Sequence, residues 1–493
     1  MYFLYEVTQK IIYFVLNLLA KYIHSRKFKK FCEARTSQYF INKIKDTENN
    51  YLEIKENNSK YFPVYWFHVA SAGEMEQAIP VARKLNEKMN ARFLLTYFSP
   101  SAEPFIKNFP ALISAFSLPI DSRKNYKLIF SSLPISKIFF VRYDIWPALL
   151  HESKNLNIEI NLLSASAIKT KNGILGKISN IWNIKFYKNF SNIFAVTKED
   201  VEYFTQFLPL ERVHYSGDAK WSRAFERANN CIKRKIEKDF SIFYSYCMAQ
   251  REVLNKKNIV FGSPHKEEDK IALDCGIIKD KVFLIYVPHD VTEESCKKII
   301  DNFRLMGTNS ILYSELISII NNTIKNDDSF ILENLYELKN HDIKRQSLFN
   351  SNNKDYNIPA HILSGYEVVI FDKIGYLAEI YEISDIAIIG GGFDGQIHNV
   401  LEAAAHGVPV LIGNLFVRAS EAKELVNRGG AISFQNTNEL FQFLIQWVSL
   451  EEQGTDSPHP TRILAQSKSK SLELFRSIPD TSEIVLQALF NEP

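Results

Sequence analysis

Short apolar runs alternate with amphipathic stretches along most of this chain, from about residue 64 onward. In the first half, the strand-like runs cover 64–70, 91–98, 115–120, 137–143, 158–166, 191–197 and 212–217. In the second half, they cover 258–264, 281–288, 309–315, 366–372, 386–392 and 408–413. Apolar strands that alternate with helices are typical of a parallel sheet covered by helices on both faces. The pattern therefore predicts an α/β protein built from two doubly wound halves.

A charged helical stretch at 222–257 separates these halves. The 493 residues also exceed what one core of roughly 250–300 residues accommodates. We expect an N-terminal helix and basic segment at 1–36, Rossmann-like domains at 37–225 and 226–450, and a C-terminal helical segment at 451–493. Ligands of such sheets bind beyond the carboxyl ends of the strands, so a cleft between the halves is the expected site.

The first thirty residues combine an apolar core with a basic cluster. The uninterrupted apolar residues are Ile11–Leu16 and, after Asn17, Leu18–Ala20. A membrane-spanning helix needs about 20 mostly apolar residues, which this stretch reaches only with Tyr2–Tyr5 included. A cleaved signal peptide carries its positive charge before the apolar region, whereas here the basic residues follow. They are Lys21, Arg26, Lys27, Lys29 and Lys30.

These features favour a helix that lies in the cytoplasmic face of a membrane, with the basic cluster on anionic headgroups. Two alternatives stay open. The first is an amphipathic helix packed on the protein's own core. The second is a single span with the basic cluster held inside.

Composition narrows the class of protein. Hydrophobic residues make up 46% and charged residues 23%, which excludes a disordered chain, a collagen-like fibre and a polytopic membrane protein. Lys and Arg total 59 against 56 Asp and Glu, so no global basic excess points to a nucleic-acid partner. The five cysteines form no CxxC pair, which argues against a disulfide framework or a cysteine zinc site and suits a reducing cytoplasm. The polar segment 321–360 is expected to be a loop or local insertion.

The stretch 386–413 carries the clearest candidate chemistry. An apolar strand ends in Gly390–Gly392, and a loop leads through His398 to a helix expected to start near Asn399. Glycines let a phosphate approach the backbone, and the first N–H groups of a helix bind anions. Glu402 would then accept both hydroxyls of a ribose. The pattern indicates nucleotide-sugar binding, and the alternative is a glycine-rich turn that merely packs tightly.

A second candidate is Glu74, which follows Ser71–Gly73 at a junction between strand and helix. A carboxylate there can serve as a general base if it reaches an acceptor hydroxyl, and the helix dipole favours its ionised form. The alternative role is capping of the helix N-terminus. Glu76, two residues on, is expected to point away and to be solvated.

Six stretches resemble, in order, the motifs of 3-deoxy-D-manno-octulosonic acid (Kdo) transferases, which take part in lipid A and lipopolysaccharide assembly. They are HVASAGE at 68–74, YDIWPALL at 143–150, HYSGDAKWSR at 214–223, FGSPHKEE at 261–268, residues 371–392, and residues 398–413. The likeness runs from about residue 64 to 430.

The resemblance implies a GT-B fold whose two domains face a cleft, with 37–225 binding the acceptor and 226–450 the nucleotide sugar. It implies CMP-Kdo as donor substrate, a lipid A precursor as acceptor, and an inverting transfer that needs no metal or cofactor. It also implies a place at the cytoplasmic face of the bacterial inner membrane.

Residue roles follow from the same resemblance. Glu74 matches the catalytic base, and Lys220 matches a basic residue that stabilises charge in the transition state. Pro288 and His289 fall where the family has a Pro-Arg pair that contacts CMP. The other implied donor contacts are Ser263, His265, Ile374, Gly375, Tyr376, His398, Asn399, Val400, Leu401 and Glu402.

The chain departs from the family pattern at two of these places. Arg142 replaces the first acid of a Glu-x-Glu motif, and it either contacts an anionic phosphate or forms a structural ion pair. His289 replaces the expected arginine. Two other functions stay open: another GT-B nucleotide-sugar transferase or epimerase, and a catalytically inactive membrane-bound relative. An epimerase needs no membrane-facing start, so residues 1–30 favour the transferase.

Overall fold

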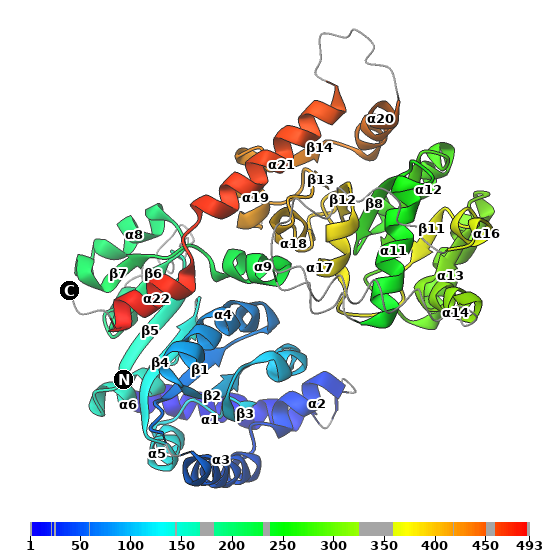
Figure 1. Cartoon of the computed structure of the whole chain (residues 1–493). Helices are drawn as coiled ribbons and strands as arrows, with labels where there is room; N and C mark the ends of the chain where they lie inside the picture. The colour runs from blue at the N-terminus through cyan, green and yellow to red at the C-terminus, as the bar shows by residue number, and fades with distance from the viewer. Residues whose placement is uncertain are drawn as a thin grey trace. The chain divides into compact units, whose positions relative to one another are not determined.

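The chain, described by a computed structural model, divides into two compact units (Figure 1). The first comprises Met1–Arg223 with Ile478–Pro493, and the second comprises Ala224–Ser477. The structure describes residues 2–20, 22–23, 26–58, 60–142, 145–167, 182–229, 237–324, 358–417, 419–449 and 459–490. Tyr143, Asp144 and residues 325–357 of the predicted insertion lie outside these ranges.

Seven parallel strands among the described residues form the sheet of the first unit, in the order β3-β2-β1-β4-β5-β6-β7. In chain order, β1 to β7 are Val64–Val69, Arg92–Tyr97, Leu112–Ser117, Ile135–Val141, Glu159–Ala165, Asn192–Ala195 and Val213–Tyr215. β1 pairs with both β2 and β4, so Phe67 lies between Leu95 and Phe139. The strand order reverses between β1 and β4, and ligand sites of doubly wound sheets lie at such switch points.

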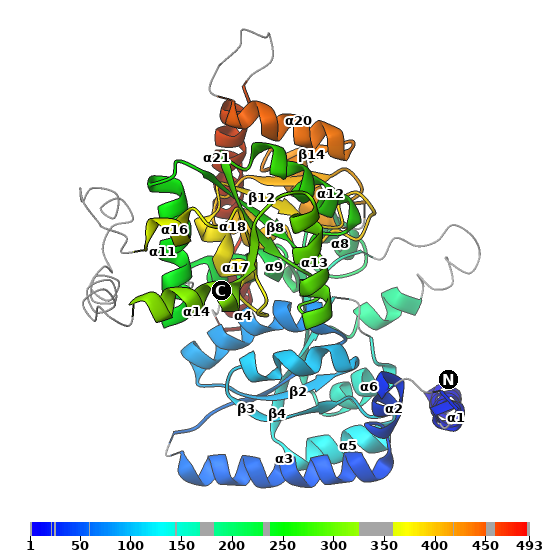
Figure 2. The ribbon, with the colours of Figure 1, turned by 90° about the vertical axis from the view of Figure 1, so that its right-hand side faces the viewer.

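Helices cover both faces of this sheet (Figure 2). The described helices of the first unit are α1 (Tyr2–Ala20), α2 (Arg26–Glu33), α3 (Ser37–Asn57), α4 (Ala72–Met89), α5 (Arg123–Ser132), α6 (Pro147–Asn155), α8 (Lys198–Thr205) and α22 (Thr481–Phe490). Helix α9 (Ala219–Asn229) begins in this unit and continues into the second one after Arg223. Trp66 of β1 packs toward Phe40 of α3 and Tyr126 of α5. Phe67, its neighbour, packs on the other face with Met75 of α4. Both faces are buried, which is why the strands read as continuous apolar runs.

The predicted C-terminal helical segment consists of two helices that belong to different units. α21 (Pro460–Ser477) is part of the second unit, and α22 is part of the first. Val485 of α22 is fully buried beside α4, and Glu483 forms an ion pair with Lys84. The Thr481 hydroxyl donates to the carbonyl oxygen of Ser216 at 2.9 Å. The end of the chain therefore completes the first core.

The second unit also has a sheet of seven parallel strands within its described residues, in the order β10-β11-β9-β8-β12-β13-β14. In chain order, β8 to β14 are Lys257–Gly262, Val282–Val287, Ser310–Leu312, Val368–Ile370, Ile386–Ile389, Val410–Gly413 and Ala431–Phe434. The edge strand β14 was not predicted. The strand order reverses between β8 and β12, the two strands that precede the predicted donor motifs.

Helices flank this sheet as well. They are α11 (Lys238–Glu252), α12 (Lys266–Asp274), α13 (Glu293–Leu305), α14 (Tyr313–Ile324), α16 (Ala360–Leu363), α17 (Leu377–Ile380), α18 (Leu401–Ala405), α19 (Ser420–Asn427), α20 (Thr437–Val448) and α21. Ile271 of α12, Phe303 of α13 and Leu440 of α20 share one core with β8 and β12. Tyr246 of α11 contacts Phe283 of β9, with ring centroids 5.6 Å apart.

Among the side chains of the N-terminal helix α1 that the structure describes, Tyr13 is buried and an apolar stripe is exposed. Tyr13 is 7% exposed, whereas Ile11, Phe14 and Leu18 are 58%, 66% and 42% exposed. Within the described ranges, no helix combines the length and the apolar character that a membrane span requires. The stripe follows the i, i+3, i+7 spacing of one helix face.

Candidate active site

Glu74 lies in the first turn of α4, directly after β1 and at the switch point of the first sheet. Ser71 is the N-cap residue, so Glu74 is the third residue of the helix. Its carboxylate accepts a hydrogen bond of 2.5 Å from the backbone N–H of Ala70, and the side chain is half-buried. Ala70 precedes the N-cap residue, so this bond ties Glu74 to the end of β1 and does not cap an N–H group of α4. A carboxylate has about four lone-pair sites, so this bond and proton acceptance are compatible.

Glu76 is not solvated, so that prediction was wrong. Its Oε2 accepts a hydrogen bond of 2.7 Å from Nε of Arg223, and the two side chains are 26% and 16% exposed. Arg223 lies on α9, far away in sequence, which is why a local pattern did not indicate the pair.

Lys220, the second candidate catalytic residue, lies in the first turn of α9 after β7. Oδ1 of Asp218 accepts the backbone N–H of Lys220 at 2.9 Å, and Asp218 is 5% exposed. The Ser164 hydroxyl accepts the backbone N–H of Ala219 at 3.3 Å. The turn that carries Lys220 is therefore held by side chains as well as by the helix.

Arg142 follows β4 and forms a structural ion pair, one of its two predicted roles. Its Nη2 donates to Oδ2 of Asp218 at 2.8 Å, and its Nε donates to Oε1 of Gln77 at 3.0 Å. The Arg142 side chain is 21% exposed. The cation at this position is thus matched by a buried carboxylate.

Three histidines meet at the carboxyl edge of the second sheet. His265 follows β8, His289 follows β9, and His398 follows β12. Nε2 of His265 and Nε2 of His398 are 2.9 Å apart, and the ring centroids of His289 and His398 are 5.0 Å apart. Nδ1 of His265 lies 2.7 Å from the carboxylate of Asp394. A bond between two ring nitrogens needs one N–H and one lone pair, so His265 and His398 are not both fully protonated.

The close packing of these side chains shifts the pKa values of His398 and Asp394. Burial lowers the pKa of His398 from 6.5 to about 4, and the positive charges of His265 and His289 contribute to the lowering. Slight burial tends to raise the pKa of Asp394, but the hydrogen bond with His265 outweighs it and the pKa is lowered. His398 is therefore neutral near pH 7, and an anion bound beside its ring would favour its protonated form.

The glycines after β12 are needed for close packing of the chain, and phosphate approach at these positions stays a prediction. A Cβ atom at Gly390 would overlap the backbone of Ser263 and Pro264. Gly391 has φ 81°, and a Cβ there would overlap the carbonyl of Gln396. These positions bring the turn at Ser263, whose φ is 50°, against the loop that leads to His398.

The helix expected near Asn399 starts later and is short. α18 spans Leu401–Ala405, five residues, and Oδ1 of Asn399 accepts the backbone N–H of Leu401 at 3.0 Å. The dipole of so short a helix is small, and one of its N–H groups is already bound. The expected start of the helix near Asn399 is therefore corrected to Leu401, and anion binding at this turn stays a prediction.

Glu402 has a partner that the sequence did not indicate. Nη1 of Arg227 donates to Oε1 of Glu402 at 2.7 Å, and Nη2 donates to the carbonyl oxygen of Gly375 at 3.4 Å. Nη2 also lies 3.7 Å from Oε2 of Glu379. Arg227 thus joins two predicted donor contacts, Glu402 and Gly375. Its signal in the sequence is weak, because it lies within the charged stretch 222–257 and outside every motif.

The remaining predicted donor residues differ in exposure. Val400 and Leu401 are 0% and 1% exposed, so a ligand meets them only at the backbone. Pro288 is also buried, and Ile374 is 82% exposed. The Tyr376 hydroxyl donates to the carboxylate of Glu237 at 2.7 Å.

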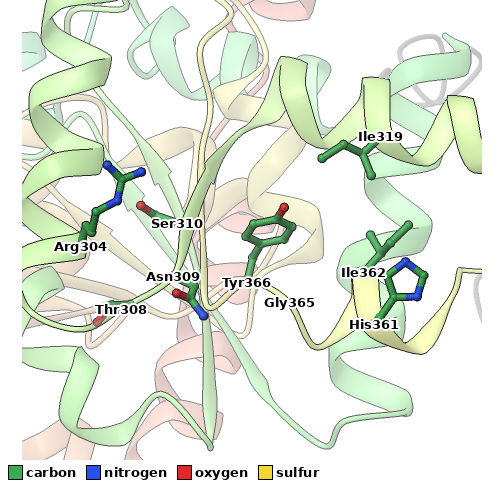
Figure 3. A pocket seen from close by; sticks show the side chains of 9 residues that line it. All are labelled: Arg304, Thr308, Asn309, Ser310, Ile319, His361, Ile362, Gly365 and Tyr366. Atoms are coloured by element: carbon green, nitrogen blue, oxygen red, sulfur yellow. The ribbon is translucent and has the colours of Figure 1, made fainter.

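A pocket of about 450 Å³ lies elsewhere in the second unit (Figure 3). It is lined by Arg304, Thr308, Asn309, Ser310, Ile319, His361, Ile362, Gly365 and Tyr366. Ser310 begins β10 and Tyr366 precedes β11, so the pocket is at the amino edge of the sheet, opposite to the histidines. Among the described residues, no group of His, Cys, Asp and Glu has the arrangement of a metal site.

Comparison with known proteins tests the family resemblance. The family model of 3-deoxy-D-manno-octulosonic-acid transferase (kdotransferase) matches residues 42–223. A 3-deoxy-D-manno-octulosonic acid transferase of Aquifex aeolicus is 26% identical over 393 residues, which cover 79% of this chain and 87% of that protein. These matches confirm the resemblance to the Kdo transferase family. The enzyme of that description from Rickettsia bellii is 22% identical over 77% of this chain and 78% of its own length.

The fold agrees with that of solved structures. UDP-GlcNAc 2-epimerase from Neisseria meningitidis covers 87% of this chain and 100% of its own, with a TM-score of 0.51 and 13% identity. At this identity the likeness concerns the fold alone. The two parallel sheets are those expected of the GT-B fold, and the predicted α/β fold class is confirmed for each unit.

Proposed function

We propose that this protein moves Kdo from CMP-Kdo to a lipid A precursor, by an inverting reaction without a metal or cofactor. The observation that carries the proposal is the position of Glu74, a half-buried carboxylate beyond the carboxyl end of β1 at the switch point of the first sheet. The family match over 42–223 includes this residue.

In the proposed reaction, Glu74 takes the proton of a glucosamine hydroxyl of the acceptor. That oxygen forms a bond to the anomeric carbon of Kdo, while the bond from this carbon to the CMP phosphate oxygen breaks. CMP leaves with the electron pair, and Lys220 stabilises the negative charge that develops. The carboxylate and the ammonium lie on turns after β1 and β7 of the same sheet.

The donor is assigned to the carboxyl edge of the second sheet. Glu402 binds the ribose, and the backbone around Gly375 and Tyr376 contacts the nucleotide. Three side chains that follow separate strands, His265, His289 and His398, replace the arginine expected at 289 as the groups that meet the donor phosphate. Because His398 has a lowered pKa, donor binding is expected to draw a proton into this cluster.

We further propose that α1 docks the enzyme on the cytoplasmic face of the inner membrane, where a lipid acceptor is found. The exposed stripe of Ile11, Phe14 and Leu18 supplies apolar surface, and the exposed Lys29 follows on α2. Apolar side chains next to basic ones are typical of helices that lie in the interface with anionic lipids.

The test is a product assay. Purified full-length protein is incubated with CMP-Kdo and a tetra-acylated lipid A precursor, and the mass of the lipid product is measured by mass spectrometry. The proposal predicts a mass increase by whole Kdo residues and stoichiometric release of CMP. CMP release without a change in the lipid would contradict the acceptor assignment. A protein that neither modifies the lipid nor binds CMP would be an inactive relative.

A further inference from the structure

We infer that a triangle of Arg142, Gln77 and Asp218 positions Glu74 relative to Lys220, so that Arg142 and Gln77 are positioning residues of the transfer reaction. This inference rests on the proposed function, because it takes Glu74 and Lys220 as the catalytic pair. It assigns a role to Arg142, the residue at which the chain departs most clearly from the family pattern.

Each corner of the triangle is bonded to the other two. Arg142 donates to Gln77 at 3.0 Å and to Asp218 at 2.8 Å. Nε2 of Gln77 donates to Oδ1 of Asp218 at 2.6 Å. Gln77 is 0% and Asp218 is 5% exposed. Buried polar networks that are closed in this way hold their members in one arrangement.

The donors and acceptors of the three side chains fix the orientation of the Gln77 amide. The Gln77 amide presents its oxygen to the guanidinium, which only donates, and its nitrogen to the carboxylate, which only accepts. Asp218 then takes three donors, because its Oδ1 also accepts the backbone N–H of Lys220. Asp218 thus links the guanidinium of Arg142 to the turn that carries Lys220.

The backbone near the triangle is strained. Arg142 has φ 64° and Ser164 has φ 47°, in the left-handed region that favours glycine. Arg142 directly follows β4 and Ser164 lies on the neighbouring β5, and Arg142 donates its backbone N–H to the carbonyl oxygen of Leu163 at 2.9 Å. Both residues hold the turn at 218–220, since Arg142 donates to Asp218 and the Ser164 hydroxyl accepts the backbone N–H of Ala219. Strain of this kind persists where surrounding structure enforces it and clusters at functional sites.

The triangle therefore joins the two catalytic elements. Gln77 lies on α4 three residues after Glu74, about one turn on, and Asp218 precedes Lys220 by two residues. A displacement of about 1 Å in catalytic geometry costs on the order of 100-fold in rate. Loss of one corner is expected to lower kcat by that order and to leave the KM for CMP-Kdo unchanged, since the donor residues are on the second sheet.

The first experiment is steady-state kinetics of full-length Arg142→Gln and Asp218→Asn with CMP-Kdo and the lipid A precursor. We expect kcat to fall about 100-fold in each, with partial recovery in Arg142→Lys, which keeps the charge. In the variant that combines Arg142→Gln and Asp218→Asn, the fall in kcat should be close to that of the more impaired single variant, because the effects of substitutions within one network do not add. The matched control is Lys137→Met, which breaks the ion pair with Glu159 at the other end of β4.

Lys137 and Glu159 are 15% and 28% exposed, comparable with Arg142, so the control loses a similar pair away from the site. An unchanged kcat in folded Arg142→Gln, or a fall of the same size in Lys137→Met, would overturn the inference.

A second readout needs no activity. Hydrogen exchange of the peptide that contains Lys220 should be slow in the parent chain, faster in Arg142→Gln and unchanged in Lys137→Met. Unchanged exchange in Arg142→Gln would also overturn the inference. Faster exchange in a protein that transfers no Kdo would contradict the proposed function and leave the triangle as an anchor of this turn.

Discussion

Arg227→Met tests whether the ion pair with Glu402 organises the donor site. The substitution keeps an unbranched side chain but removes the cation that bonds Glu402 at 2.7 Å and lies 3.7 Å from Glu379. These two carboxylates are 15% and 8% exposed, so in the variant both lose the cation that they share and have little solvent to replace it. Glu402 is then expected to turn away from the position in which it meets a ribose.

The magnitude follows from the type of bond that is lost. A hydrogen bond to a charged group contributes about 1.5–3 kcal/mol net. Because the pair is partly exposed, we take about 2 kcal/mol, which is roughly 30-fold in Kd. Isothermal titration of CMP into the full-length protein measures this change directly.

The matched control is Arg428→Met, which removes an exposed i, i+4 pair with Glu424 of 3.2 Å in the same unit. Such pairs contribute about 0.3–0.5 kcal/mol, so its CMP affinity should equal that of the parent chain. Parental affinity in Arg227→Met would refute the reasoning. Tighter binding would show that Arg227 competes with the ribose for Glu402.

Three further predictions concern the donor site, its pH dependence and the membrane. Glu402→Ala should weaken CMP binding in the same titration, and unchanged affinity would exclude the ribose contact. Because the pKa of His398 is lowered from 6.5 to about 4, the unfolded chain binds a proton there that the native chain does not, and stability falls as the pH falls through this window. In urea unfolding, the free energy of unfolding of His398→Asn should fall less between pH 6.5 and about 4 than that of the parent chain. An equal fall in both proteins would contradict this prediction. Joint Phe14→Ser and Leu18→Ser substitution should move the protein out of the membrane fraction, whereas Leu210→Ser, at another exposed position, should not; retention of the joint variant on membranes would implicate another surface.

The strands of both sheets could be predicted because their residues are buried on both faces. β1 and β9 are buried at every position and read as unbroken apolar runs. β14 was not predicted, because it is a four-residue edge strand whose two central residues are half-buried and therefore does not form an apolar run. Between β2 and β3 the chain forms the 3-10 helix Pro100–Asn108, with a second proline, Pro104, inside it.

The site was predictable where one motif follows one strand, as with Glu74 after β1 and His398 after β12. It was not predictable where partners are far apart in sequence. Arg227 and Glu402 are 175 residues apart, and Arg142 and Asp218 are 76 apart. No periodicity or spacing joins such residues, because the fold alone brings them together.

The central claim is that Glu74 is the base that activates the acceptor hydroxyl. The most direct measurement compares Glu74→Gln with the parent chain in two assays on the same preparations: Kdo transfer followed by mass spectrometry, and CMP affinity by titration. The amide can still accept the N–H of Ala70 but cannot take a proton at neutral pH. We predict that transfer is abolished while CMP binding is nearly unchanged. Substantial residual transfer in Glu74→Gln would contradict the account.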